Sequence, residues 1–200
     1  AQAVIGTVDG VAGVIVGIVI VNPGSGYGAG EQPAVTITGA GTGAVARAIA
    51  NITLQDIRAG NDIDILAGTG VTLLNTIRAD QGHVSIVTDA GNMNLAARTL
   101  LVSSFGDDIE LTARRGAITA QQLAADGDVT VSAMTGVTLL NAVNSTGFFQ
   151  TGDVTISTIN GNIAAVAPNG LISVQNGGVS LESVNGTILV PGVFNVTGNI

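Results

Sequence analysis

Short stretches of alternating apolar and polar residues, separated by glycine, run along most of the chain. From Gly60 onward, pairs such as Gly127-Asp128 are followed by an apolar-x-apolar triplet, and a second glycine comes nine or ten residues later. Alternation with a period of two predicts a strand that buries one face. The predicted inward pairs of the first strand in each repeat are Ile63/Ile65, Val84/Ile86, Ile109/Leu111, Val129/Val131, Val154/Ile156 and Ile172/Val174.

A second series of apolar residues follows the internal glycine of each repeat. It consists of Val71/Leu73, Met93/Leu95, Ile118/Ala120, Val137/Leu139, Ile163/Ala165, Val179/Leu181 and Ile188/Val190. A third and weaker series falls in the irregular part of the repeat, at Ile77, Leu101, Leu123, Val143 and Val166. Each repeat is therefore predicted to hold two short strands and a third segment that is less regular.

The heptad TGVTLLN occurs twice, at 69–75 and at 135–141. The separation is 135 − 69 = 66 residues, or three repeats of 22, and a period of this length indicates stacked repeats. Stacking pairs each strand with its equivalent in the next repeat at about 4.8 Å and fills the interior with columns of Ile, Val and Leu. We therefore predict an all-β fold, a parallel β-helix of about six turns between Gly60 and Pro191. An antiparallel β-sandwich also uses short alternating strands, but it does not account for the repeated heptad.

Residues 1–50 follow a different pattern. The stretch from Val11 to Val21 is rich in β-branched residues, and the alternating PAVTIT at 33–38 predicts another strand. This predicts a small glycine-rich β module over residues 1–50, followed by the β-helix over residues 51–200. The GAGTG at 39–43 lacks the lysine and the amphipathic helix that accompany phosphate-binding loops, so we interpret its glycines as turn residues.

Composition narrows the range of partners. With 14 acidic and 6 basic residues the net charge is −8, which disfavours non-specific binding to nucleic acid or to an anionic membrane surface. There is no cysteine, which excludes a disulfide framework and thiolate metal sites. The longest apolar run, Val11 to Val21, has 11 residues, whereas a membrane-spanning helix needs about 20. We therefore expect no transmembrane segment.

Three segments carry a resemblance to a known family. GDDIELTARRGAITAQ (106–121), GDVTVSAMTGVTLLN (127–141) and GDVTISTINGNIAAV (152–166) together resemble the repeats of filamentous-haemagglutinin-type bacterial surface adhesins. The resemblance covers roughly residues 55–190 and implies a secreted, right-handed parallel β-helix. Residues 20–50, with NPGSGYG and VTITGAGTGA, resemble a GSGY/VTITG β module of bacterial surface and phage-tail-like proteins, which implies no chemistry.

Acidic residues that follow the turn-opening glycines are the main candidates for chemistry. Stacking would gather them at one corner of the fold: Asp62, Asp107, Asp108, Asp128 and Asp153. Such a ladder could bind calcium through carboxylate oxygens or supply the acid and base of a glycosidase. Aspartate in a turn also accepts hydrogen bonds from backbone N–H groups, and we favour this interpretation. His83 takes the equivalent place in its own repeat and, as the only histidine, excludes a multi-histidine metal site; we expect a solvated turn residue.

Other polar and aromatic residues give weaker signals. Arg114 and Arg115 could form a sugar-binding patch with the acids upstream, or a solvated corner with surface ion pairs. No GxSxG context surrounds the serines, and Ser103, Ser104 and Ser132 have no nearby base in the sequence, so nucleophilic catalysis has no support. Phe148 and Phe149 could form an exposed contact or fill a widened core, and Asn51, Asn144, Asn185 and Asn195 begin glycosylation sequons.

Together these features predict a secreted structural or adhesive module at the cell surface, without enzymatic activity, cofactor or metal. It is expected to assemble head to tail or to continue in a longer chain, with surface glycans as candidate partners. The alternative is a carbohydrate-active β-helix, a polysaccharide lyase or tailspike-like hydrolase, with catalytic residues among Asp107, Asp108, Glu110 and Arg114.

Overall fold

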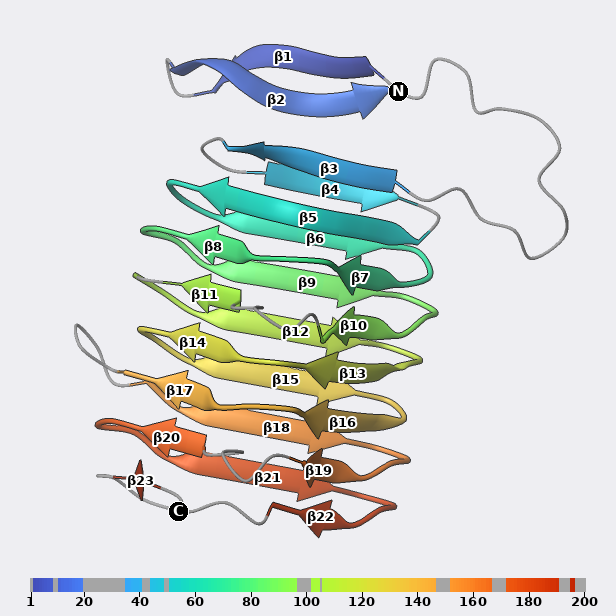
Figure 1. The fold of residues 1–200 in the computed structure, drawn as a ribbon, viewed down its shortest axis with the longest axis vertical. Helices are drawn as coiled ribbons and strands as arrows, with labels where there is room; N and C mark the ends of the chain where they lie inside the picture. The colour runs from blue at the N-terminus through green and yellow to red at the C-terminus, as the bar shows by residue number, and fades with distance from the viewer. Residues whose placement is uncertain are drawn as a thin grey trace, which may run out of the picture.

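The computed structural model describes residues 2–8, 11–19, 35–40, 44–48, 51–96, 102–104, 106–146, 152–166, 172–190 and 195–196, and the side chains within 51–96, 106–146, 152–166 and 172–190. Every regular element in these ranges is a β-strand. The strands are short and stacked, with equivalent strands above one another (Figure 1).

One face of the stack is a seven-stranded sheet in which all neighbours are parallel. We call its members the first strands. They are β4 (Ala44–Ala48), β6 (Ile63–Ala67), β9 (Val84–Thr88), β12 (Ile109–Ala113), β15 (Val129–Ala133), β18 (Val154–Thr158) and β21 (Val179–Ser183).

A 14-stranded sheet contains the other two strands of each turn. Its two halves meet at β5 (Ile52–Ala59), which pairs with β7 through Ile52 to Leu54 and with β8 through Ile57 to Ala59. β3 (Val35–Ala40) pairs with β5 on its other side. The second strands are β7 (Val71–Leu73), β10 (Met93–Leu95), β13 (Ala117–Ala120), β16 (Gly136–Leu139), β19 (Ile163–Ala165) and β22 (Ile188–Leu189). The third strands are β8 (Ile77–Ala79), β11 (Val102–Ser104), β14 (Leu123–Ala125), β17 (Val143–Ser145), β20 (Ile172–Val174) and β23 (Asn195–Val196).

The predicted fold class is confirmed: the structure is all-β, and its stacked sheets are parallel as in a β-helix. Six of the seven first strands follow Gly60, which is the number of turns that the sequence predicts. The two TGVTLLN copies lie three steps apart in the stack, because Val71 aligns with Met93, Met93 with Ile118, and Ile118 with Val137. The right-handed sense of the coil stays a prediction.

The register of the last turns differs from the prediction. Ile172 and Val174 belong to the third strand β20, whereas Val179 and Leu181 belong to the first strand β21 and pair with Val154 and Ile156. The turn therefore opens at Gly177, which is equivalent to Gly152 of the preceding turn because Val179 pairs with Val154.

Two residues that the sequence assigned to the third series are not found in a third strand of the described structure. Val166 was assigned to the third series, but it directly follows the second strand β19 and is 64% exposed. Leu101 lies outside the described residues, and the third strand of that turn starts at Val102.

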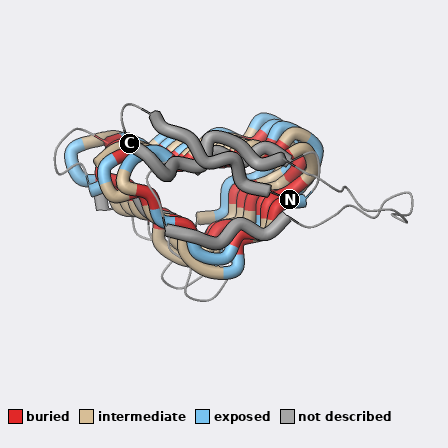
Figure 2. The backbone as a smooth tube through the Cα atoms, turned by 90° about the horizontal axis from the view of Figure 1, so that it is seen from above, coloured by how far each residue is buried: buried red, intermediate tan, exposed pale blue. Residues whose placement is uncertain are grey.

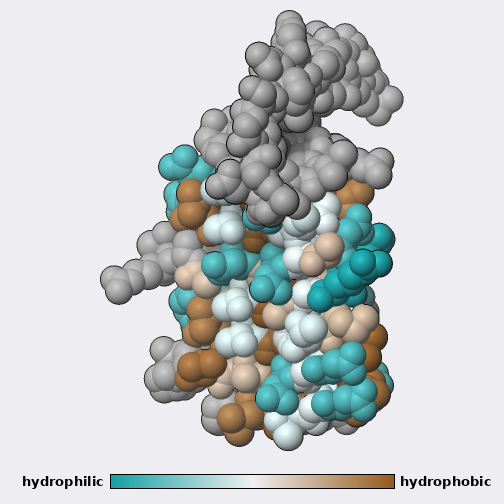
Figure 3. Space-filling model, turned by 90° about the vertical axis from the view of Figure 1, so that its right-hand side faces the viewer, coloured by the Kyte–Doolittle hydropathy of each residue, from teal (hydrophilic) through white to brown (hydrophobic). Residues whose placement is uncertain are grey.

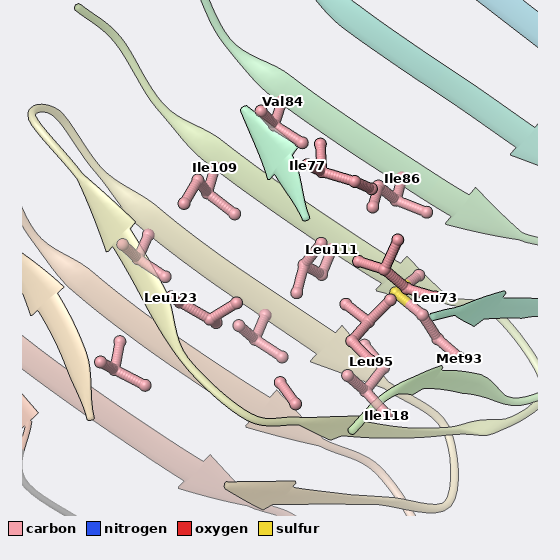
Figure 4. Close-up of a cluster of buried hydrophobic side chains, with 14 of the residues drawn as sticks. Leu73, Ile77, Val84, Ile86, Met93, Leu95, Ile109, Leu111, Ile118 and Leu123 are labelled. Atoms are coloured by element: carbon pink, nitrogen blue, oxygen red, sulfur yellow. The ribbon is translucent and has the colours of Figure 1, made fainter. Parts of the chain in front are cut away.

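The core is a set of apolar columns between the sheets. All predicted inward residues of β6, β9, β12, β15 and β18 are buried, and viewed along the stack the buried positions of successive turns fall behind one another (Figure 2). In the close-up, Ile86, Leu111 and Ile118 extend from different strands into the same interior (Figure 4). Burial of a Leu or Ile side chain contributes about 1.5–3 kcal/mol, so these columns are the main source of stability.

Close stacking at the turn between first and second strands requires glycine. A Cβ atom on Gly91 would overlap the carbonyl oxygen of Thr69, and one on Gly161 would overlap that of Thr135. Beside this turn, the buried hydroxyls of Thr88 and Thr158 donate to the carbonyl oxygens of Gly91 and Gly161, at 2.9 and 2.6 Å. These bonds offset the cost of burying a hydroxyl group.

At the N-terminal end, β1 (Gln2–Val8) and β2 (Val11–Val19) form an antiparallel hairpin that is a sheet of its own. It lies beyond β3 and β4 in Figure 1. Since β3 and β4 pair in parallel with β5 and β6, the stacked sheets extend across residue 50; the division of the chain into domains at that residue stays a prediction. Among the described residues, no helix has the length and apolar character to span a membrane.

Candidate functional site

The residues that precede the first strands share one corner of the stack. Because the first strands pair in register, the positions before Ile63, Val84, Ile109, Val129, Val154 and Val179 lie above one another. These positions, which we call the carboxylate corner, hold Asp62, His83, Asp108, Asp128, Asp153 and Gly178. The predicted gathering of the aspartates therefore holds for four of the five, with Asp107 next to Asp108.

Each aspartate of the corner accepts a hydrogen bond from the backbone of the next turn. Asp108 Oδ1 accepts from the N–H of Asp128, and Asp128 Oδ1 from that of Asp153, both at 2.7 Å. Asp153 Oδ1 accepts from Gly178 N–H at 2.6 Å, and Asp62 Oδ1 from His83 N–H at 3.1 Å. The sequence analysis favoured aspartates that accept hydrogen bonds from backbone N–H groups of their own turn. The structure shows such bonds, but the N–H groups belong to the next turn. The corner thus links successive turns through charge-assisted hydrogen bonds.

The same bonds bear on cation binding at the corner. One oxygen of each aspartate already faces the positive end of an N–H dipole, which competes with a cation for that oxygen. Within the parts of the chain whose side chains are described, no group of three or more His, Cys, Asp or Glu residues is placed to hold a metal ion.

A groove of about 440 Å³ lies beside the corner, over the outer face of the first strands. Its walls are mostly acidic and hydroxyl side chains: Asp64, His83, Ser85, Asp107, Asp108, Ile109, Glu110, Asp128 and Thr130. The predicted candidates Asp107, Asp108 and Glu110 do come together here. Asp64 was missed by sequence reasoning; the available signal was its outward position on β6, two residues after Asp62.

Arg114 does not join this groove. Its Nη1 atom forms an ion pair with Asp89 Oδ1 at 2.7 Å, at the other end of the first strands. Both side chains are about half exposed, so the pair contributes little to stability.

On the flank drawn in Figure 3, hydrophilic and hydrophobic side chains lie next to one another, and exposed apolar residues of the described chain include Ile159 and Val184.

His83 is the one member of the corner whose side chain can carry a positive charge. Its ring lies between two carboxylates of the preceding turn, with Nδ1 3.2 Å from Asp62 Oδ1 and Nε2 3.0 Å from Asp64 Oδ1. The hydrogen bond with Asp64 is the main reason why the pKa of His83 is raised above its ordinary value, although partial burial acts in the opposite direction. The ring is therefore engaged with the fold, where the sequence suggested a solvated turn residue.

A second charged cluster lies at the end of the third strands. Arg58 and Arg78 are neighbours across β5 and β8, and both reach Asp80, Arg58 through Nη2 at 2.9 Å and Arg78 through Nε at 2.6 Å. Their hydrogen bonds, with that of Arg78 the stronger influence, lower the pKa of the Asp80 carboxyl. The carboxylate relieves the repulsion between the two stacked guanidinium groups.

The remaining sequence candidates are scattered. Ser132 Oγ accepts a hydrogen bond from Ser157 Oγ at 3.3 Å in the neighbouring turn. Asn51 accepts from Thr69 Oγ1, and Asn185 donates to Asn160 Oδ1. Phe148 and Phe149, and the side chains of Ser103, Ser104 and Asn195, lie outside the described residues.

Comparison with known proteins yields no relative. No protein-family model, curated protein or solved structure matches this chain.

Proposed function

We propose that the chain is a structural or adhesive module of a bacterial surface fibre, exported to the cell surface, in which the stacked turns act as a rigid spacer. The observation that carries this proposal is the use of the corner carboxylates: Asp108, Asp128 and Asp153 each bond the backbone of the next turn. Together with the continuous apolar columns, this arrangement favours a chain whose polar groups serve the stack itself. In a repeat architecture of this kind each turn contacts only its neighbours, so the contacts between adjacent turns stabilise the whole stack.

Assembly end to end is the second part of the proposal. In the last described turn, Ile188 and Leu189 are 45% and 66% exposed, whereas Ile163, which precedes Ile188 in the same column, is fully buried. The next layer would cover this column, and either a further turn of a longer chain or a second unit could supply it. An uncovered strand edge also offers unpaired N–H and C=O groups for strand addition.

Sedimentation velocity and electron microscopy of the 200-residue chain test this assembly, with Ile188→Glu, in the uncovered column, as the test variant and Leu74→Glu as the control. Leu74 is also an exposed apolar residue, 53% exposed, but it follows β7 far from the last turn. We expect concentration-dependent filaments that Ile188→Glu weakens and Leu74→Glu leaves intact. A stable monomer at high concentration, or equal effects of the two variants, would argue against end-to-end contact through this edge.

The acidic groove favours a second candidate function, a carbohydrate-active β-helix with Asp107, Asp108 and Glu110 as the reacting groups. Paired carboxylates are the usual acid and base of glycoside hydrolysis. Incubation with a panel of polysaccharides distinguishes the two functions. The structural proposal predicts no release of reducing ends, whereas release that Glu110→Gln abolishes in a folded protein would establish the enzyme.

A further inference from the structure

His83 interrupts the carboxylate corner. Asp62, Asp108, Asp128 and Asp153 each bond a backbone N–H group of the following turn. The ring of His83 is directed the other way, toward the preceding turn, where its two nitrogen atoms meet two different carboxylates. The turn that carries β9 is therefore joined to the turn that carries β6 by a side chain whose charge depends on pH.

The number of protons on the ring decides how many of these contacts are favourable. A neutral imidazole has one N–H donor, and its other nitrogen presents a lone pair. With Nδ1 3.2 Å from Asp62 Oδ1 and Nε2 3.0 Å from Asp64 Oδ1, a neutral ring can donate to only one of the two and sets a lone pair against the other. Only the imidazolium form makes both contacts favourable, as a hydrogen bond to Asp64 and as an ion pair with Asp62.

We propose that His83 is a proton-operated clamp, which ties the β9 turn to the β6 turn when the imidazole is protonated and loosens that joint when the proton leaves.

The surroundings of the ring support the charged form from both sides. Asp62 and Asp64 face it from the preceding turn, and Asp107, Asp108 and Glu110 approach the same groove from the following turn, with Asp128 one turn further. Among the described residues, the groove lining contains no arginine; Arg58 and Arg78 bond Asp80, and Arg114 bonds Asp89. Loss of the proton would leave Asp62 and Asp64 to repel one another without the imidazolium between them.

The direction of the pH dependence follows from the raised pKa of His83 in the folded chain. A group whose pKa is higher in the folded than in the unfolded state stabilises the fold fully below the unfolded pKa, which is about 6.5 for histidine. That contribution is lost as the pH rises through the folded pKa. The clamp is therefore closed at mildly acidic pH and opens toward alkaline pH.

A titration of the imidazole by nuclear magnetic resonance tests the geometry directly, because His83 is the only histidine. We expect a midpoint above about 6.5 that falls in Asp64→Asn, while Asp153→Asn, at the same corner but three turns away from His83, leaves it unchanged. An ordinary midpoint, or one that ignores Asp64→Asn, would overturn the proposal.

Thermal unfolding tests whether the contact acts as a joint. The wild type is compared with His83→Gln, which keeps one side-chain donor but cannot be protonated, between about pH 6 and about pH 9. The wild type should have its largest advantage in melting temperature at the acidic end, and this advantage should shrink as the pH rises. A difference that does not change with pH would show that His83 serves only packing.

Discussion

Replacement of Leu111 by alanine is a direct test of the apolar columns. Leu111 is fully buried in the middle of β12, and its neighbours in the column are Ile86 on β9 and Val131 on β15. Removing a buried leucine side chain costs about 2.7–5.0 kcal/mol, and more where the cavity cannot collapse. Here both neighbouring strands are held in place by parallel ladders, so we expect a loss of about 3–5 kcal/mol.

Urea unfolding followed by far-ultraviolet circular dichroism measures this loss. With a slope of about 2 kcal/mol per molar urea, the midpoint should fall by about 1.5–2.5 M. Thr112→Ala is the matched control, because Thr112 is the next residue on the same strand and its side chain is on the outer face; its effect should stay within about 0.5 kcal/mol. Similar shifts for the two variants would refute the assignment of inner and outer faces.

Three further predictions concern the core, the turns and the corner. Val131→Asp should unfold the chain, since it buries an unpaired charge, while Thr155→Asp at an exposed strand position should be tolerated; circular dichroism of both variants that shows equal folding would contradict this. Gly91→Ala should lower the melting temperature more than Gly70→Ala, because the new Cβ overlaps a carbonyl oxygen at Gly91 but approaches no atom closer than 2.9 Å at Gly70; the reverse order would exclude the proposed close stacking. Melting temperatures in excess chelator and in millimolar calcium should coincide, and a clear rise with calcium would restore a metal site at the corner.

Much of the core could be predicted because its signal is local. On β12 and β18 the alternation of Ile109 with Leu111 and of Val154 with Ile156 assigns the inward face without reference to the rest of the chain. The last turns were assigned wrongly because alternation shows which face of a strand is buried but does not show which strand of the turn that segment forms. Ile172/Val174 and Val179/Leu181 alternate in the same way, and only the pairing with earlier turns distinguishes a third strand from a first strand.

The site was predictable in location but not in its contacts. Equivalent positions before the first strands indicated that the aspartates would stack, and they do. The partners of these side chains depend on register, which varies with the length of each turn: Asp108 bonds a residue 20 positions away, whereas Asp128 bonds one 25 positions away. For the same reason the sequence did not show that Arg114 would meet Asp89 or that His83 would meet Asp64.

The in-register stacking of parallel turns underlies every other conclusion, and disulfide formation tests it most directly, since the chain has no cysteine of its own. Ser132 and Ser157 are aligned on β15 and β18, with their Oγ atoms 3.3 Å apart, which is a separation that a disulfide can bridge after replacement by cysteine. The double variant Ser132→Cys/Ser157→Cys should therefore form an intramolecular disulfide on mild oxidation. The control Ser132→Cys/Thr155→Cys should not, because Thr155 aligns with Thr130, two residues away. Equal crosslinking of both pairs, or crosslinking of the control alone, would contradict the stacked register.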